Sequence, residues 1–413
     1  RQRQMCIRDR ETTIDLNDMT SLREKVNQIF HYWRNKRNIT IPFSAEQRYR
    51  FLTAINKQIS MSAAAGALIP IKEKEFSKID FVQDSILDCL HNYRQAQIVG
   101  GAGTGKTFIG IKKAVRDVLD EKKVLFICCN EELTAFVRSR LSQYPKIDVF
   151  TYAELMRNLL GDLYDELPTN PDGNKSCFEY MDDVPAEKKY DSIIVDEAQD
   201  FDIDMGLAIR SLMLDDSTSS LYVFYDKNQN VFEMDFENAF AIDAPPYVLR
   251  YNIRNTGSIY QCAVERTNLG RDTVANNIVG VHPEIHNYTK PSQAVKALSL
   301  IVNRLVQKEY VPSESIVIVS DSPYENSILA GETRIGAYNL VFKHYRDVCE
   351  DEICFKTAEE FKGLESNVVI YLTHEFTNLP SSTIDNRKEY VAITRARYYL
   401  YVLNTKCKAT IGD

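Results

Sequence analysis

The sequence predicts an α/β fold with parallel sheets, and three observations lead to this prediction. An apolar run at Gln97–Val99 precedes a glycine-rich turn, Gly100–Thr107, after which apolar residues recur with a helical period. A second apolar run, Ile193–Val195, ends in two carboxylates, as is typical of a central parallel strand buried on both faces. After Pro245-Pro246 an α/β pattern begins again, so we expect two successive domains.

Length, composition and charge exclude several classes of protein. A chain of 413 residues is long enough for two or three domains, and its 44% apolar content is that of a globular protein. No apolar run approaches the ~18 residues of a membrane span, so we expect neither a signal peptide nor a membrane partner. Nine cysteines without C-x-x-C pairs predict reduced thiols in an intracellular, cytoplasmic protein. A net charge of −8 argues against a basic coat for nucleic acid but leaves a local basic track open.

The N-terminal part is predicted to stand apart from the catalytic domains. Residues 1–10, RQRQMCIRDR, lack periodicity and resemble translated adapter sequence, so we expect a non-native tail on an N-terminally truncated fragment. Residues 11–75 are predicted to be a helical extension, because the pattern from Ser21 to Ala64 is helical and rich in Arg, Lys and Gln. Trp33 lies there in a basic cluster, where stacking on a nucleic-acid base and packing on the core both remain open.

The glycine-rich turn has the pattern G-x-x-x-x-G-K-T, which binds phosphate through backbone N–H groups at a helix N-terminus. Lys106 brings positive charge to the β- and γ-phosphates, and the Thr107 hydroxyl is a candidate Mg²⁺ ligand. The predicted nucleotide-binding residues are therefore Gly100, Gly101, Ala102, Gly103, Thr104, Gly105, Lys106 and Thr107. The helix that follows is expected to bury Ile111, Ala114, Val115, Val118 and Leu119.

Two carboxylates follow the strand in YDSIIVDEAQDF, at the strand end where open α/β sheets bind ligands. Asp196 is predicted to hold the Mg²⁺ shell and Glu197 to polarise the attacking water. The remaining acidic residues of this run are expected to be solvated: Asp200, Asp202 and Asp204. Gln229, in the loop after the predicted strand Leu221–Tyr225, is a candidate contact to the γ-phosphate.

Other predicted elements complete the two domains. In the first domain we also predict strands at Lys123–Cys129 and Asp148–Thr151, a helix at Asn130–Leu141 and a surface insertion over residues 161–190. The second domain gains one predicted helix and three strands, at Gln293–Gln307, Ser315–Ser320, Asn367–Leu372 and Tyr398–Asn404.

Six short motifs in a fixed order carry a resemblance to a known family. They are GGAGTGKT, VDEAQDF, YDKNQ, YNIRN, FKGLE and YVAITRAR, and together they resemble the superfamily 1 helicases of the UvrD/Rep type. The resemblance extends from Gln83 to the end of the chain. It implies two tandem RecA-like P-loop domains with parallel sheets, at residues 76–246 and 247–413, with ATP as substrate and Mg²⁺ in the cleft between them.

The resemblance also implies roles for residues that spacing alone does not assign. Arg254 and Arg395 would reach the γ-phosphate from the second domain, as arginine fingers do in phosphoryl transfer. Gln83 would bind adenine and Glu365 the ribose. Residues facing single-stranded nucleic acid, with DNA expected and RNA as an alternative, would be Asn130, Thr151, Tyr152 and Phe232.

Three departures from the family pattern affect the expected activity. Ile253 stands where the family has a tyrosine that stacks on adenine, and the usual DNA-stacking tryptophan is missing, which leaves Phe232 as the nearest aromatic. The accessory insertions are short, so processive unwinding is in doubt and an ATP-driven switch without unwinding is the alternative function. The compact pattern is also similar to helicases that follow a nuclease-related (NERD) domain, which would lie upstream of residue 1.

Overall fold

The structure is a computed structural model, and it describes residues 22–37, 65–77, 81–90, 92–128, 130–169, 175–231, 238–376 and 383–407. The chain divides into two compact units, residues 1–62 and 63–413. Helix α1 (Leu22–Arg37) is the described element of the first unit. The predicted tail at residues 1–10 lies outside the described residues. None of the described helices is both long and apolar enough to span a membrane.

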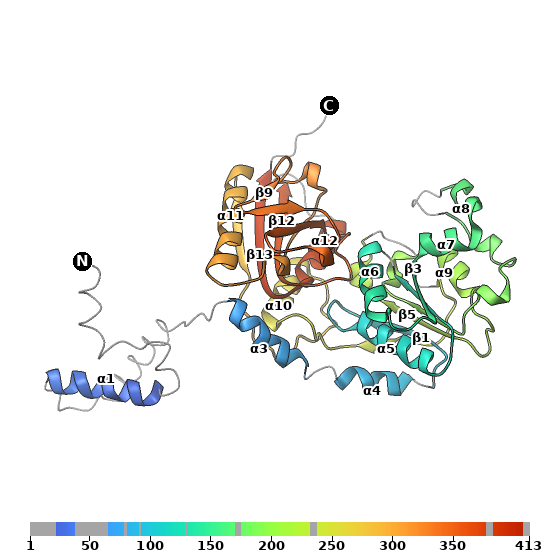
Figure 1. Ribbon diagram of the computed structural model, residues 1–413, viewed down its shortest axis with the longest axis horizontal. Coiled ribbons are helices and arrows are strands. Elements are labelled where there is room, and N and C mark those ends of the chain that lie inside the picture. Colours follow the sequence, from blue (N-terminus) through green and yellow to red (C-terminus); the bar gives the residue numbers. More distant parts are fainter. Residues whose placement is uncertain are drawn as a thin grey trace. The chain divides into compact units, whose positions relative to one another are not determined.

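The second unit contains two β-sheets, which confirms the predicted α/β fold class (Figure 1). The first sheet has the order β3-β2-β4-β5-β1-β6, and all its strand pairs are parallel. Its strands are β1 (Gln95–Gly100), β2 (Val124–Cys128), β3 (Ile147–Thr151), β4 (Ser192–Val195), β5 (Ser220–Tyr225) and β6 (Tyr247–Leu249). Because β4, β5 and β1 are neighbours, the residues that follow their carboxyl ends lie side by side.

The second sheet has the order β7-β13-β12-β8-β11-β10-β9. Its strands are β7 (Glu284–Tyr288), β8 (Ile316–Ser320), β9 (Arg334–Ile335), β10 (Tyr338–Val341), β11 (Glu352–Thr357), β12 (Ser366–Phe376) and β13 (Ala396–Cys407). The sheet is mixed, because the edge strand β9 runs antiparallel to β10 while the other described pairs are parallel. The described strand pairs are parallel, as predicted, except at this edge, where a tight hairpin connects the two short strands.

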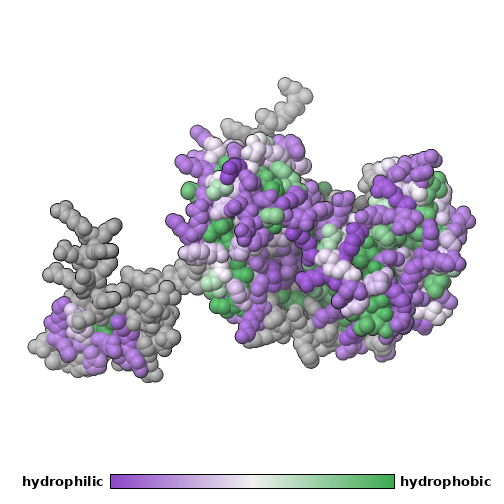
Figure 2. Space-filling view, viewed as in Figure 1, coloured by the Kyte–Doolittle hydropathy of each residue, from purple (hydrophilic) through white to green (hydrophobic). Residues whose placement is uncertain are grey.

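Helices cover both faces of each sheet. On the first sheet, α5 (Lys106–Leu119) and α6 (Glu131–Leu141) pack on one face, and α7 (Tyr152–Leu160) and α9 (Ile203–Arg210) on the other. On the second sheet, α11 (Pro291–Gln307) packs on one face, and α10 (Gly257–Thr267) and α12 (Thr383–Thr394) on the other. We call the two halves the first and second lobes. Hydrophilic residues dominate their visible surface in Figure 2.

Two helices that precede the first sheet pack on different lobes. Helix α3 (Ala65–Ser77) buries Ala65 and Ile69 in the apolar core of the second sheet. Helix α4 (Phe81–Leu90) buries Leu87 and Leu90 against the first sheet (Figure 1). The end of the predicted N-terminal extension thus contributes to the second lobe, because Ala65 and Ile69 join the apolar cluster that α11 forms with the second sheet.

Three sequence predictions need correction. Strand β6 pairs with β1, so a division after residue 246 would separate it from its sheet. Residues 161–190 include the short helix α8 (Asp162–Glu166) and bury Tyr164, Cys177 and Met181 in the first lobe's core, so they are not a mere surface insertion. Leu119 is 69% exposed, because the buried face of α5 runs through Ile109, Ala114 and Asp117 instead.

We expect Gly66→Ala to destabilise the packing of α3 on the second lobe. The Gly66 N–H donates to the Glu309 carbonyl at 2.8 Å, and a Cβ at this position would collide with the backbone of Tyr310. Such overpacking costs about 1–3 kcal/mol in the free energy of unfolding. Thermal and denaturant unfolding would measure the loss. The control is Ala67→Ser on the exposed side of the same helix, which should unfold like the wild type. Equal stability of all three proteins would contradict the close packing of α3.

Candidate nucleotide site

The glycine-rich turn connects β1 to α5, as the sequence predicts. Gly103 and Gly105 have φ angles of +74° and +88°, which only glycine adopts without strain, and Gly105 is the N-cap of α5. The residues from Gly100 to Thr107 are all buried. The turn thereby presents backbone N–H groups at a helix N-terminus, which is the arrangement that binds phosphate.

Lys106 is positioned over this turn. Its ammonium group donates to the carbonyl oxygens of Gly100 at 2.9 Å and Gly101 at 3.3 Å, and lies 4.0 Å from a carboxylate oxygen of Asp226. The side chain is 5% exposed, so its charge acts in a medium of low polarity. Asp226, which lies in the motif YDKNQ but received no predicted role, is therefore the acidic partner of this lysine.

Asp196 and Glu197 follow β4, next to the turn. Asp196 is fully buried, and its Oδ1 accepts a hydrogen bond from the Glu197 N–H at 3.0 Å. The nearby Thr107 side chain lowers the pKa of this carboxyl group, while Oδ2 has no hydrogen-bond partner among the described residues. A buried carboxylate oxygen without a partner, beside a threonine hydroxyl, has the donor chemistry that Mg²⁺ requires. The predicted metal ligands Thr107 and Asp196 therefore fit the ion.

The environment gives the two carboxyl groups opposite pKa shifts. Burial, followed by the charge of Glu197, raises the pKa of Asp196. Burial would also raise the pKa of Glu197, but the positive charges of Lys106, Lys362 and Arg395 hold it below its ordinary value. Glu197 also has a φ of +54°, which is rare for a residue other than glycine and is a form of strain that functional sites store. Glu197 thus stays ionised, as a group that polarises water requires.

A chain of hydrogen bonds connects these groups to the second lobe. Gln229 donates to Asp226 at 2.6 Å, and its carbonyl Oε1 accepts a hydrogen bond from Arg395 at 3.2 Å. Gln199 donates to Glu197 at 2.5 Å and accepts from the Asp226 N–H at 3.0 Å. Arg395 is 1% exposed, and burial together with the charge of Arg254 lowers its pKa to about 10. The structure thus brings Lys106, Glu197, Gln229 and Arg395 together.

Arg254 lies at the edge of the same site. Its Nε is 2.5 Å from a carboxylate oxygen of Glu365, whose other oxygen is 3.5 Å from Arg397. Arg254, Glu365 and Thr107 all line one cavity of about 400 Å³ between the lobes. The two residues assigned to the γ-phosphate and the ribose are therefore neighbours that pair with each other.

Lys362 is a site residue that the sequence reasoning missed, although it lies in the quoted motif FKGLE. It is 1% exposed, and its ammonium group contacts Asp200 at 2.6 Å and the Gln229 carbonyl at 2.8 Å. The expectation that Asp200 is solvated is therefore wrong. Asp202 and Asp204 are also engaged, since Asp202 caps α9 and Asp204 accepts from the Cys177 N–H.

The second lobe also contacts the backbone of the turn directly, which the sequence did not indicate. The Ile253 N–H donates to the Gly103 carbonyl at 2.7 Å, and the Asn252 side chain donates to the Ala102 carbonyl at 3.0 Å. The Tyr390 hydroxyl accepts from the Ala102 N–H at 3.3 Å. Asn252 and Ile253 lie in the motif YNIRN, and Tyr390 lies in YVAITRAR. Membership in these motifs is the only feature of the sequence that could have indicated the contacts.

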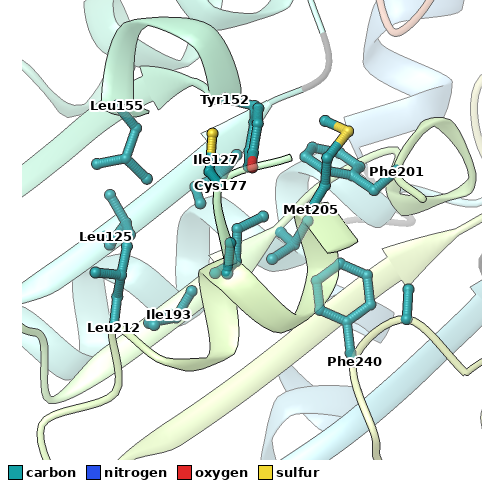
Figure 3. Packing of buried hydrophobic residues seen from close by; sticks show 14 of the residues in the cluster. Leu125, Ile127, Tyr152, Leu155, Cys177, Ile193, Phe201, Met205, Leu212 and Phe240 are labelled. Atoms are coloured by element: carbon teal, nitrogen blue, oxygen red, sulfur yellow. The ribbon is translucent and has the colours of Figure 1, made fainter. Parts of the chain in front are cut away.

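The residues predicted to face nucleic acid have structural tasks in this conformation. Asn130 caps α6 and donates to the Lys362 carbonyl at 3.1 Å, while Thr151 forms a capping box at the start of α7. Tyr152 is 6% exposed and packs in the first lobe's core near Ile127 (Figure 3), so its ring is not available for base stacking here.

Two further predicted site residues are only partly covered by the structure. Phe232, predicted to contact nucleic acid, lies outside the described residues. Gln83, predicted to bind adenine, lies in α4, whose described backbone places it ahead of β1, but its side chain is not described. The roles of both residues stay predictions.

Comparisons with known proteins bear on the first lobe. Residues 83–234 match a family described as an AAA domain, and this stretch contains the glycine-rich turn. No curated protein matches the chain.

Similar solved structures include two of arterivirus nonstructural protein 10 (helicase), one of them in complex with DNA. Both are 12% identical to this chain, with TM-scores of 0.38 and 0.37, and cover 75% of it. The chain covers 60% and 59% of those two proteins, so it spans about three fifths of their length.

We expect Lys362→Met to destabilise the protein strongly, because it leaves the Asp200 carboxylate buried without its cation. Removing one partner of a buried ion pair costs about 3–5 kcal/mol. Chemical denaturation would measure this loss, and Asp200→Asn in the same chain should restore part of it. The control is Lys388→Met, whose pair with Glu359 is more exposed and is worth about 1 kcal/mol or less. Equal stabilities of the two single variants would refute the importance of the buried pair.

Proposed function

We propose that the protein hydrolyses ATP in the cleft between its lobes and uses the cycle to move along single-stranded nucleic acid, as a helicase or translocase of the UvrD/Rep type. The observation that carries this proposal is the position of Arg395. This second-lobe arginine is hydrogen-bonded to Gln229, which connects it through Asp226 to the phosphate-binding Lys106. Positive charge for the transferred phosphoryl group thus comes from both lobes.

The protein's own groups divide the catalytic work. Lys106 and the turn would bind the β- and γ-phosphates, and Glu197 would orient and polarise the attacking water. Arg395 and Arg254 would stabilise the charge that develops on the γ-phosphate. Thr107 and Asp196 would hold Mg²⁺, which would supply further positive charge to the phosphates. Gln229 and Arg395 would both contact the γ-phosphate, so loss of that phosphate would weaken the contact between the lobes and allow them to move.

A switch without unwinding is the second candidate, and the engaged state of Asn130, Thr151 and Tyr152 favours it. Those side chains cap helices or lie in the core, so contact with a strand would require them to rearrange or other residues to take their place. Both candidate functions need the same hydrolysis site. They differ in whether the motion of the lobes moves the protein along a nucleic-acid strand or only switches its conformation.

We expect three substitutions to separate the steps of hydrolysis. Lys106→Ala should abolish turnover and weaken nucleotide binding, whereas Glu197→Gln should keep binding and lower turnover by about 10²–10⁴-fold. Arg395→Lys should bind nucleotide normally but lose about 10³-fold or more in turnover, because lysine lacks the planar fork of arginine. Binding by calorimetry and phosphate release would be compared with Arg271→Ala, an exposed control in the second lobe. Normal turnover of Arg395→Lys would exclude a role for this arginine in stabilising the transferred phosphoryl group.

We expect single-stranded DNA to stimulate hydrolysis, with an effect that falls as salt rises because phosphate contacts release counterions. Phosphate release would be measured with and without DNA or RNA oligonucleotides over a range of stated salt concentrations. A forked duplex labelled with a fluorophore would then report unwinding. Stimulation without unwinding would select the switch, and equal rates with and without nucleic acid would contradict both candidates.

A further inference from the structure

Helix α6 carries a contact between the lobes that lies outside the phosphate turn. Leu133, Phe136 and Ser139 follow one another at intervals of three residues, so they lie on one side of the helix. Gly363 of the second lobe approaches Leu133 so closely that a Cβ there would lie 2.8 Å from its side chain. Arg346 of the second lobe hydrogen-bonds to Ser139, and its guanidinium group lies 4.3 Å from the centre of the Phe136 ring. This side of α6 therefore packs against the second lobe.

Glu132, in the first turn of α6, supplies the charged part of this contact. Its side chain is buried, and one carboxylate oxygen lies 2.5 Å from the Lys356 ammonium group and 3.2 Å from His344 Nδ1. The other oxygen accepts a hydrogen bond from the Tyr345 N–H at 3.3 Å. Lys356 is buried as well, and its ammonium group also donates to the Phe342 carbonyl at 3.4 Å. These three partners of Glu132 all belong to the second lobe, and we call Glu132, His344, Tyr345 and Lys356 the α6 latch.

The α6 latch makes closure sensitive to the charge of Glu132, because the ion pair is buried in the closed arrangement. Where both members of a pair are shielded from water, removing one leaves the other as an uncompensated buried charge, which is strongly unfavourable. Water can reach both side chains once the lobes separate, so the same removal costs little in an open form. Neutralising Glu132 alone therefore disfavours closure, whereas neutralising Glu132 and Lys356 together leaves no unpaired charge.

Both ends of the α6 latch continue directly into the nucleotide site. In the first lobe, α6 follows β2, and the Ile127 carbonyl near the end of β2 accepts a hydrogen bond from the Asp196 N–H at 2.9 Å. In the second lobe, Lys356 lies in β11, and the chain then runs through Lys362 to Glu365. The latch therefore limits how far the site residues of the two lobes can move apart.

We propose that Glu132 is a positioning residue, which holds the lobes together through Lys356 before any nucleotide binds and so raises the nucleotide affinity of the cleft. Every group in the α6 latch belongs to the protein, so the latch acts in the absence of nucleotide. Its effect on affinity rests on the proposed function, since it assumes a nucleoside triphosphate at the turn. A protein whose binding-competent form is populated only in part binds its ligand more weakly by that fraction. The latch thus sets the resting population of the closed, competent form.

The first test is hydrogen exchange in residues 342–346 of the full chain without nucleotide, measured by mass spectrometry. Glu132→Gln keeps the size of the side chain but removes its charge, so the lobes should open more often and these amides should exchange about tenfold faster or more. The control is Glu131→Gln, the same substitution at the neighbouring exposed residue, which should exchange like the wild type. Thermal unfolding of each variant would confirm that it is folded.

The second test measures ATP binding and turnover. The apparent affinity of Glu132→Gln for ATP should fall about 5- to 150-fold, the usual range for a coupling between two sites. Turnover at saturating ATP should stay within about threefold of the wild type, because bound nucleotide then closes the lobes. Lys356→Met should also weaken binding. The double variant Glu132→Gln with Lys356→Met, which leaves no unpaired member of this ion pair, should bind ATP more tightly than either single variant.

Several results would overturn the inference. Unchanged exchange in Glu132→Gln would show that the α6 latch does not hold the lobes together, and an equal effect of Glu131→Gln would assign the change to the charge of the helix terminus. Lower turnover at saturation with unchanged affinity would place Glu132 in the chemical step instead. A double variant whose loss is the sum of the two single losses would mean that the two residues act independently.

In each of these cases hydrolysis of ATP by the wild type would leave the proposed function standing. A wild type that binds no triphosphate would refute the proposed function and the effect on affinity, whereas the exchange test, which uses no nucleotide, would still decide whether Glu132 holds the lobes together.

Discussion

The structure depends on holding several charges in a place that excludes water. Lys106, Asp196, Glu197, Asp226 and Arg395 are all at most 5% exposed. Charges at such depth are costly unless each has an opposite charge or a hydrogen-bond partner. The pairing is complete only across the lobes, because Arg395 and Lys362 reach Gln229 and Asp200 from the second lobe. The site is therefore a property of the two lobes together, and separating them would expose or unpair its charges.

The order of the strands explains how the first lobe brings its charged groups and the glycine-rich turn together. β4, β5 and β1 are adjacent, so Asp196, Asp226 and the glycine-rich turn emerge next to one another at one edge of the sheet. The second lobe then closes on this edge through the backbone of the turn itself, where Asn252 and Ile253 contact the carbonyls of Ala102 and Gly103. A phosphate that changed the backbone conformation of the turn would therefore alter these contacts to the second lobe directly.

Much of this could be predicted from the sequence, and the failures have physical causes. The positions of β1, β4 and β5 and of the glycine-rich turn follow from local patterns, because a short apolar run indicates a buried strand and the turn needs its glycines. The burial of Asp200 could not be predicted, because its partner Lys362 is remote in the sequence. A carboxylate within a run of acidic residues is usually exposed to solvent, so the local pattern indicated the opposite. Tyr152 was expected to face nucleic acid, yet the start of α7 turns it into the core. The parallel pairing of β6 was missed because three residues carry too little periodicity to assign.

The path of the chain adds a constraint on how the lobes can move. The chain passes from α3 on the second lobe to α4 on the first, and passes back between β6 and α10. Any opening of the cleft must therefore be absorbed at two connections rather than one, which favours rotation about the line that joins them over free separation. Glu73 of α3 lies 3.8 Å from Arg397, which in turn faces Glu365 in the cavity. The helix that precedes the earlier connection thus lies close to the nucleotide site, and its ion pair with Arg397 joins it to the residues that position Arg254.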